Sequence, residues 1–199
     1  MKKLSYCLIC LLLINSNLLA FSSNPREFVE ELLNEAITKL SDKSLTKEEK
    51  SKFVEDIANE NVDINALALY TLGELRKSSE KKDILKYQLT FKKYFLKTLT
   101  SRLSDYSSSK FEILESEQKS SNYTIVSTKM RPDDGAPEIK IDWRIYTKNP
   151  DKPLIRDLIV EGLSLARTQK EEFSSILSSN NNDINILISK LEEFLIKQD

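Results

Sequence analysis

The 199-residue sequence contains no histidine and only three glycines. Without histidine, the Ser-His-Asp and Cys-His catalytic arrangements and all His-ligated metal sites are excluded. The glycines, Gly73, Gly135 and Gly162, form neither a G-x-G-x-x-G pattern nor a Walker A loop. Nucleotide binding through such loops is therefore excluded as well. We expect no catalytic residue, no cofactor and no metal ion.

The sequence also lacks a surplus of charge of either sign. Thirty basic and 31 acidic residues give a net charge of −1, so the basic surface typical of a nucleic-acid-binding protein is not expected. Hydrophobic residues make up 40% of the chain, which indicates a folded rather than a disordered protein.

The N-terminus has the pattern of an export signal. Lys2 and Lys3 precede an apolar run of about 11 residues, shorter than the roughly 20 residues that a membrane-spanning helix needs. Small residues follow, and cleavage after Ala20 or after Ser22 fits equally well. We predict a secretory signal peptide over residues 1–22 and a single domain over residues 23–199. Both cysteines, Cys7 and Cys10, lie in the signal peptide, so the mature chain would contain no thiol.

Apolar residues recur at helical spacing through the first half of the mature chain. Predicted helices begin at Asn24-Pro25, at Thr46 with Glu49 three residues later, at Asp63 and near Ser79. The third ends at Gly73 and the fourth runs to about Tyr106. Two further helices are predicted after Gly162 and after the turn at residues 180–182.

The fourth predicted helix carries two rows of apolar residues. One row is Ile84, Tyr87, Phe91, Phe95 and Leu99, and the other is Leu85, Leu89, Leu96 and Leu103. A surface helix normally has a single apolar stripe. We therefore expect this helix to be covered on more than one side, between a sheet and other helices. We interpret the lysines of its basic run, residues 81–95, as a solvated face rather than a nucleic-acid or membrane contact.

From Lys110 the spacing changes to that of strands. Four strand-length runs, KFEILESEQ, NYTIVSTKM, EIKIDWRIYTK and PLIRDLIVEG, are separated by short turns that require antiparallel neighbours. In the third, Ile139, Ile141, Trp143 and Ile145 alternate with charged residues and predict an apolar sheet face. The fold class is α+β: a four-stranded, twisted antiparallel meander sheet packed on helices from both ends of the chain.

The remaining acidic residues favour structural roles. Asp133 and Asp134 lie beside Gly135 in a predicted turn, where aspartates are common turn formers. Asp157 lies in an otherwise apolar strand and needs a partner such as Arg131, Arg144 or Arg156. The apolar surplus of the helices and the sheet is compatible with a filled core or with a hollow core that binds an apolar ligand. Periodicity does not distinguish the two.

Three segments together resemble the MlaC family of periplasmic phospholipid carriers, also described as toluene-tolerance auxiliary proteins. Residues 62–106 are similar to the family's Val-Asp and Leu-Gly stretch followed by a long helix. The strands around TIVSTKM and IKIDWRIY form the second segment, and IRDLIVEGLSLARTQKEEFSSIL, residues 155–177, forms the third. Gln169-Lys170 stands where family members commonly have Tyr-Arg.

The resemblance implies an NTF2-like or MlaC-like fold and a non-enzymatic carrier in the periplasm. Such a carrier holds phospholipid acyl chains between the sheet and the helices, and it maintains outer-membrane lipid asymmetry. Its partners would be an outer-membrane MlaA–porin complex and the MlaD component of an inner-membrane ABC transporter. From the apolar rows, the expected lipid contacts are Leu69, Leu72, Phe91, Phe95, Ile125, Ile141, Trp143, Val160 and Phe173. Asp157 and Gly162 are expected to be structural, and we expect a monomer.

Two other classes of function remain open from the residues alone. An NTF2-like isomerase or dehydratase would need an acid or base in its pocket, for which Tyr123 and Asp157 are the best candidates. A structural envelope protein would have a filled core and no ligand.

Overall fold

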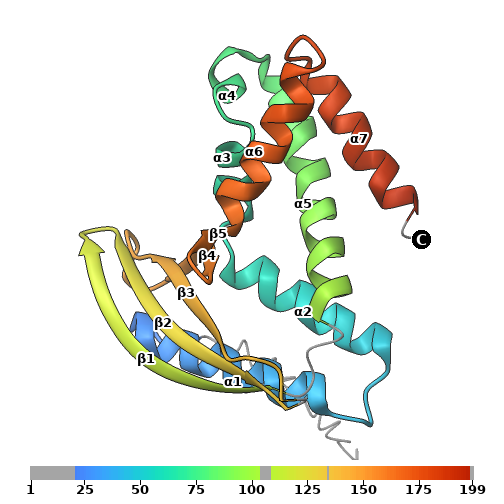
Figure 1. Ribbon diagram of the computed structural model, residues 1–199. Helices are drawn as coiled ribbons and strands as arrows, with labels where there is room; N and C mark the ends of the chain where they lie inside the picture. The colour runs from blue at the N-terminus through green and yellow to red at the C-terminus, as the bar shows by residue number, and fades with distance from the viewer. Residues whose placement is uncertain (1–20, 104–108, 134, 198–199) are drawn as a thin grey trace, which may run out of the picture.

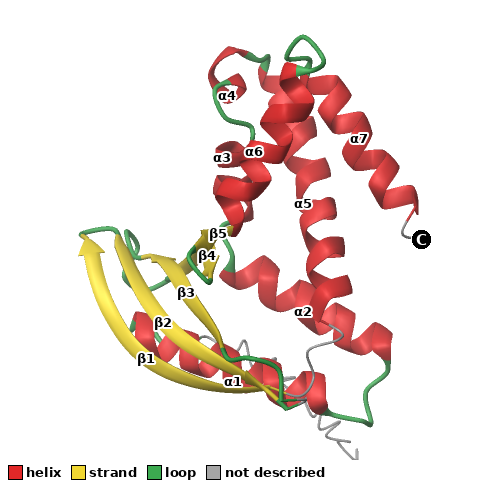
Figure 2. Cartoon of the chain, in the orientation of Figure 1, coloured by secondary structure: helices red, strands yellow, loops and turns green. Residues whose placement is uncertain are grey.

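The computed structural model describes residues 21–103, 109–133 and 135–197. The predicted signal peptide therefore lies almost entirely outside the described residues. Within these described residues, five helices precede a sheet and two follow it. Figures 1 and 2 show how they are arranged. The helices are α1 (Pro25–Ser41), α2 (Lys47–Asn61), α3 (Ile64–Thr71), α4 (Leu75–Ser78), α5 (Lys81–Leu103), α6 (Leu165–Ser178) and α7 (Ile184–Lys197). The predicted α+β class is confirmed.

The first three helices begin where their capping residues predict. The Asn24 side chain accepts hydrogen bonds from two backbone amides at the start of α1. Thr46 and Glu49 form a reciprocal capping box on α2, and the Asp63 carboxylate accepts from the Ala66 amide at the start of α3. Each cap satisfies backbone donors that have no partner within the helix. The short α4 was not expected from the sequence.

The sheet contains the four predicted strands and a fifth of two residues. Its strands are β1 (Ser109–Ser120), β2 (Tyr123–Pro132), β3 (Ile139–Tyr146), β4 (Leu154–Val160) and β5 (Leu163–Ser164). They lie in chain order, and every neighbouring pair is antiparallel. The meander topology is therefore confirmed, and β5 continues directly into α6.

The register assigns side chains to two different faces of the sheet. Val126 lies opposite Trp143 and Thr128 lies opposite Ile141, which places these four residues on the apolar face. Ile125 lies opposite Arg144, on the other face. Ile125, expected among the lipid contacts, therefore points away from the face that carries Ile141 and Trp143.

Buried apolar side chains form two separate clusters. The sheet core packs α1 against the apolar face, and its buried residues are Phe28, Val29, Leu32, Leu33, Val126, Trp143, Ile145 and Ile155. The helical core lies among α2, α3, α5, α6 and α7. Figure 1 shows the sheet and α1 in the lower part of the molecule and the bundle of α3, α5, α6 and α7 above them. Val62, between α2 and α3, packs against both cores.

The two apolar rows of α5 have different surroundings. The principal neighbours of α5 are α7, α3 and α2, rather than a sheet and helices as predicted. Tyr87 and Phe91 of the first row are buried, but Leu85 and Leu89 of the second row are 60% and 66% exposed. The expectation that both rows are covered is therefore wrong for the N-terminal half of α5.

Candidate functional site

The apolar face of the sheet is the first part of the candidate site. The Trp143 indole is buried, and its Nε1 donates a hydrogen bond of 3.0 Å to the Thr128 hydroxyl. That hydroxyl in turn donates to the Ile141 carbonyl oxygen at 3.2 Å. These bonds fix the indole while leaving its ring available for apolar contacts. Ile141 and Val160 lie opposite one another on β3 and β4, and both are only partly buried.

The helical core supplies the second part. Phe91 stacks on Phe95 with ring centroids 6.2 Å apart and meets Phe173 edge-on at 6.3 Å. Leu72, Phe91 and Phe173 are buried, whereas Phe95 is half-buried at the margin of the cluster. Leu69 is half-buried and belongs to neither core. Aromatic pairs in this geometry stabilise a core beyond their buried area.

Buried Tyr87 orders the centre of the helical core. Its hydroxyl shares a hydrogen bond of 2.8 Å with the Thr71 hydroxyl of α3. Burial away from water raises the pKa of Tyr87 far above its usual value, because the phenolate would be poorly solvated there. This residue therefore stays neutral, and it joins α5 to α3.

The structure divides the expected lipid contacts between the two cores. Ile141 and Trp143 belong to the sheet core, whereas Leu72, Phe91, Phe95 and Phe173 belong to the helical core. Their own side chains fill both clusters. The candidate site is therefore the junction of the two cores, marked by Val62, which packs against both.

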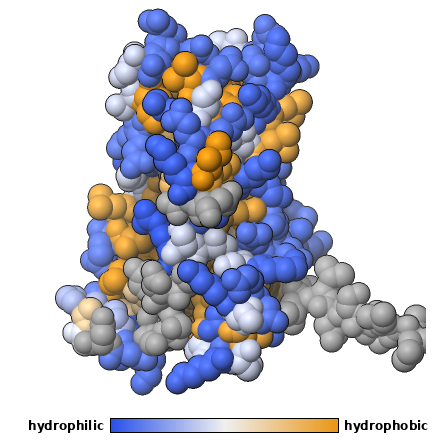
Figure 3. Space-filling model, turned by 90° about the vertical axis from the view of Figure 1, so that its right-hand side faces the viewer, coloured by the Kyte–Doolittle hydropathy of each residue, from blue (hydrophilic) through white to orange (hydrophobic). Residues whose placement is uncertain are grey.

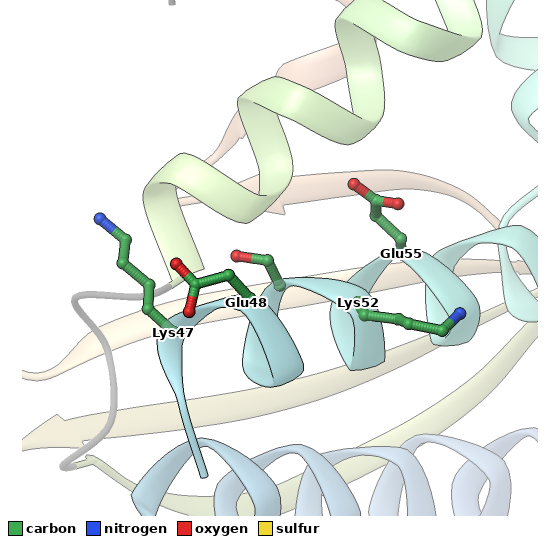
Figure 4. Close-up of a pocket in the computed structure, with 5 residues that line it drawn as sticks. Lys47, Glu48, Lys52 and Glu55 are labelled. Carbon is green, nitrogen blue, oxygen red and sulfur yellow. The ribbon is translucent and has the colours of Figure 1, made fainter. Parts of the chain in front are cut away.

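Two surface hollows are polar and differ from the apolar slot that the sequence suggests. One, of about 410 Å³, is lined by Lys47, Glu48, Ser51, Lys52 and Glu55 of α2 (Figure 4). The other, of about 400 Å³, lies between α3 and α6 and is lined by Tyr70, Arg167, Lys170, Glu171 and Ser174. Neither hollow includes an expected lipid contact.

An arginine clamp joins the two halves of the molecule. The Arg156 guanidinium of β4 donates to the Asp63 carboxylate from Nε at 2.8 Å and from a terminal nitrogen at 2.7 Å. It also donates to the Tyr123 hydroxyl at 2.8 Å and lies 3.4 Å from the centre of the Tyr146 ring. These hydrogen bonds raise the pKa of Arg156, although partial burial acts the other way and is the largest single influence.

Sequence reasoning did not find this clamp. Asp63 was identified as a helix cap, and Arg156 was considered as a partner for Asp157. The β-bulge beside Arg144 shifts the register of β4 relative to β3. Such a bulge redirects side chains and leaves no clear signal in the sequence.

Asp157 holds the end of the sheet to the start of α6. Its carboxylate accepts hydrogen bonds from the Ser164 hydroxyl at 2.6 Å and from the Ala166 amide at 3.0 Å, and Arg144 lies 3.6 Å away. The turn between β4 and β5 needs left-handed backbone at Glu161 (φ 49°) and Gly162 (φ 82°). Glycine adopts that conformation without strain, which explains why a glycine occupies position 162.

The candidate catalytic groups have separate partners. Tyr123 accepts a hydrogen bond from Arg156, whereas Asp157 is bonded to Ser164 and Ala166. Asp133 is exposed in its turn, and Asp134 lies outside the described residues. Over the described ranges, no cluster of three acidic side chains could hold a metal ion. The acid and base proposed for an NTF2-like enzyme are thus not brought together by a shared hydrogen bond.

The comparisons with known proteins decide the family. The model of the family described as MlaC protein matches residues 30–193. The chain belongs to the MlaC family. No curated protein matches it in sequence.

A solved structure shares this MlaC fold. It is the phospholipid-binding protein from Ralstonia solanacearum, solved in complex with a phospholipid. The two proteins are 16% identical, and the match has a TM-score of 0.72 and covers 87% of this chain and 97% of the other. Across residues 21–103, 109–133 and 135–197, no helix combines the length and hydropathy needed to cross a membrane.

Proposed function

We propose that this MlaC-family protein binds a diacyl phospholipid and carries it through the periplasm. The observation that supports this most is the family match over residues 30–193, together with the same fold in a protein solved with a phospholipid bound. Each buried methylene contributes about 0.8 kcal/mol, so two acyl chains can drive binding with little recognition of the headgroup. An enzymatic activity is not proposed, because the candidate acid and base have separate partners.

The acyl chains would enter at the junction of the sheet core and the helical core. Ile141 on the sheet and Phe95 on α5 are half-buried at the margins of the two cores, and Val160, opposite Ile141 on β4, is half-buried as well. These side chains can therefore reach a ligand with little rearrangement. The chains would displace contacts between the two cores, such as those of Val62. The Arg156 clamp would keep the two halves together during this opening.

The carrier would be exported by its signal peptide and would exchange lipid with an outer-membrane MlaA–porin complex and with MlaD of an inner-membrane transporter. This step of the proposal rests on the family alone. It agrees with the apolar run after Lys2 and Lys3, and with a mature chain free of thiols that an oxidising compartment would attack.

Lipid extraction combined with native mass spectrometry tests the proposal. We expect the purified protein to carry phospholipid and Ile141→Asp and Phe95→Asp to lose it, because a carboxylate is strongly disfavoured in an apolar slot. Ile196→Asp is the matched control, since Ile196 is 75% exposed and the variant should keep its lipid. Circular dichroism must show that all three variants fold.

The outcomes separate the proposed function from its alternatives. Lipid-free protein that takes up no phospholipid from vesicles would support a structural role instead. Full lipid occupancy in folded Ile141→Asp would mean that the apolar face of the sheet does not line the site. Conversion of a small carbonyl compound, abolished in Asp157→Asn at unchanged stability, would favour the isomerase or dehydratase.

A further inference from the structure

The most basic helix of the protein also exposes two leucine side chains. Helix α5 contains seven basic residues and one acidic residue, whereas the whole chain has a net charge of −1. Leu85 and Leu89, one turn apart on this helix, are 60% and 66% exposed. Positive charge and exposed aliphatic side chains therefore coincide on one element.

The lysines surround the leucines on the same side of the helix. At 3.6 residues per turn, Lys81, Lys82, Lys86, Lys92 and Lys93 all lie within about 80° of the mean direction of Leu85 and Leu89. All five lysines are exposed. The buried first row, which includes Tyr87 and Phe91, lies on the opposite side. We call the seven exposed residues Leu85, Leu89, Lys81, Lys82, Lys86, Lys92 and Lys93 the Lys/Leu face.

Little negative charge neutralises this face. Lys82 pairs with Glu80 at 2.9 Å, and Lys86 lies 3.7 Å from Glu192 of α7. Both pairs are exposed, and such pairs bind weakly. Within the described part of the chain, Lys81, Lys92 and Lys93 form no salt bridge. The face is therefore complementary to a surface that is both anionic and apolar.

The composition of the face favours a bilayer over a protein partner. Centres of protein interfaces are enriched in tyrosine, tryptophan and arginine and depleted in lysine. The Lys/Leu face has none of those three residues and five lysines. A helix with leucines on its exposed face and lysines at the edges matches the pattern of interfacial binding, in which leucine enters the acyl boundary and lysine reaches the headgroups.

The sequence alone suggested a merely solvated lysine face, but the exposed Leu85 and Leu89 change that interpretation. We propose that the Lys/Leu face of α5 docks the protein on the surface of anionic phospholipid bilayers. The contact would be peripheral and reversible, because two leucines bury only a small apolar area and most of the attraction comes from charge. The face is distinct from the candidate lipid site, since Leu85 and Leu89 belong to neither core. Docking therefore does not depend on whether the protein carries lipid.

Vesicle co-sedimentation tests this proposal. We expect the purified protein to bind vesicles containing phosphatidylglycerol at least about tenfold better than pure phosphatidylcholine vesicles, and to be released by 0.5 M salt. Lys92→Gln/Lys93→Gln and Leu85→Gln/Leu89→Gln should each lower the partition coefficient on the order of tenfold. Every variant keeps the same N-terminus, so any contribution of the leader is common to all.

Matched controls come from exposed positions elsewhere. Lys148→Gln/Lys152→Gln removes the same charge from the turn between β3 and β4, and Leu114→Gln removes an exposed leucine from β1. Both should bind like the parent protein. Circular dichroism and lipid content should be unchanged in every variant, which separates docking from carriage.

Four results would overturn the proposal. The first two are that the protein sediments with neither kind of vesicle, or that it binds both kinds equally well. The other two are that the face variants and the control variants lose the same amount of vesicle binding, or that both face variants bind vesicles as well as the parent protein. A change in oligomeric state of Leu85→Gln/Leu89→Gln, with vesicle binding unchanged, would instead assign the face to a second copy of the chain.

Discussion

Among the described residues, Asp157 is the one charged side chain that is buried. Its carboxylate holds Ser164 and the Ala166 amide, so it ties β4 to the start of α6. We expect Asp157→Asn to lower the free energy of unfolding by roughly 1–3 kcal/mol, because an amide cannot accept on both sides. Urea denaturation measures this. Asp151→Asn, in an exposed turn, should change stability by less than about 0.5 kcal/mol.

Buried Tyr87 should make the stability of the protein decrease at alkaline pH. Burial raises its pKa in the folded protein, so the unfolded chain releases the phenolic proton first as pH rises. The free energy of unfolding is unaffected by Tyr87 below about pH 10. Above that pH, ionisation of this tyrosine in the unfolded chain lowers it by about 1.4 kcal/mol per pH unit. Urea denaturation at increasing pH should show that the free energy of unfolding falls less steeply in Tyr87→Phe than in the parent protein. Tyr70→Phe, at a 40% exposed position, should retain the parental slope.

Some residue-scale features were visible in the sequence, and others were not. Asn24, Thr46 and Asp63 were identified as helix caps because capping depends on neighbours within four residues. The face of Ile125 was not identified, because Ile125 and Val126 are adjacent apolar residues on opposite faces and the sequence did not show which of them points inward. The position of Ile125 opposite Arg144 is set by pairing with a second strand.

At the scale of elements, the Arg156 clamp joins α3 to the sheet. Arg156→Lys should lower the free energy of unfolding by roughly 1–3 kcal/mol, since an ammonium cannot make the paired bonds to Asp63 and the stacking on Tyr146 together. Hydrogen exchange at the first amides of α3 should accelerate. Arg131→Lys is the control, because Arg131 forms exposed pairs with Glu112 and Glu138. Equal effects of the two substitutions would contradict a special role for the clamp.

Element types could be predicted from the sequence, but their contacts could not. The change from helical to alternating spacing near Lys110 identified the meander sheet, and short turns fixed its antiparallel order. The second leucine row of α5 suggested burial, although Leu85 and Leu89 face solvent. Periodicity reports which residues share a side, and only the tertiary fold decides whether that side is covered.

For the whole molecule, the division into two cores determines where a ligand can act. A single apolar pocket was the natural expectation from rows on four elements. The structure instead places α1 on the sheet and gathers the later helices into their own cluster, with Val62 in contact with both. A ligand at the junction would connect these two cores, whereas a ligand within one core would leave the other unaffected.

The division into two cores determines how a bound lipid should change hydrogen exchange. A phospholipid bound at the junction should slow hydrogen exchange in both cores, in β2 and β3 on one side and in α5 and α6 on the other. It should also raise the melting temperature, because a ligand that binds only the folded state adds about 2.7 kcal/mol at one hundred times its dissociation constant. Hydrogen-exchange mass spectrometry of lipid-loaded and delipidated protein measures the first effect, and thermal denaturation followed by circular dichroism measures the second. Protection restricted to the sheet would place the lipid between α1 and β1–β4 alone, and the contribution of Phe91, Phe95 and Phe173 to binding would then be excluded.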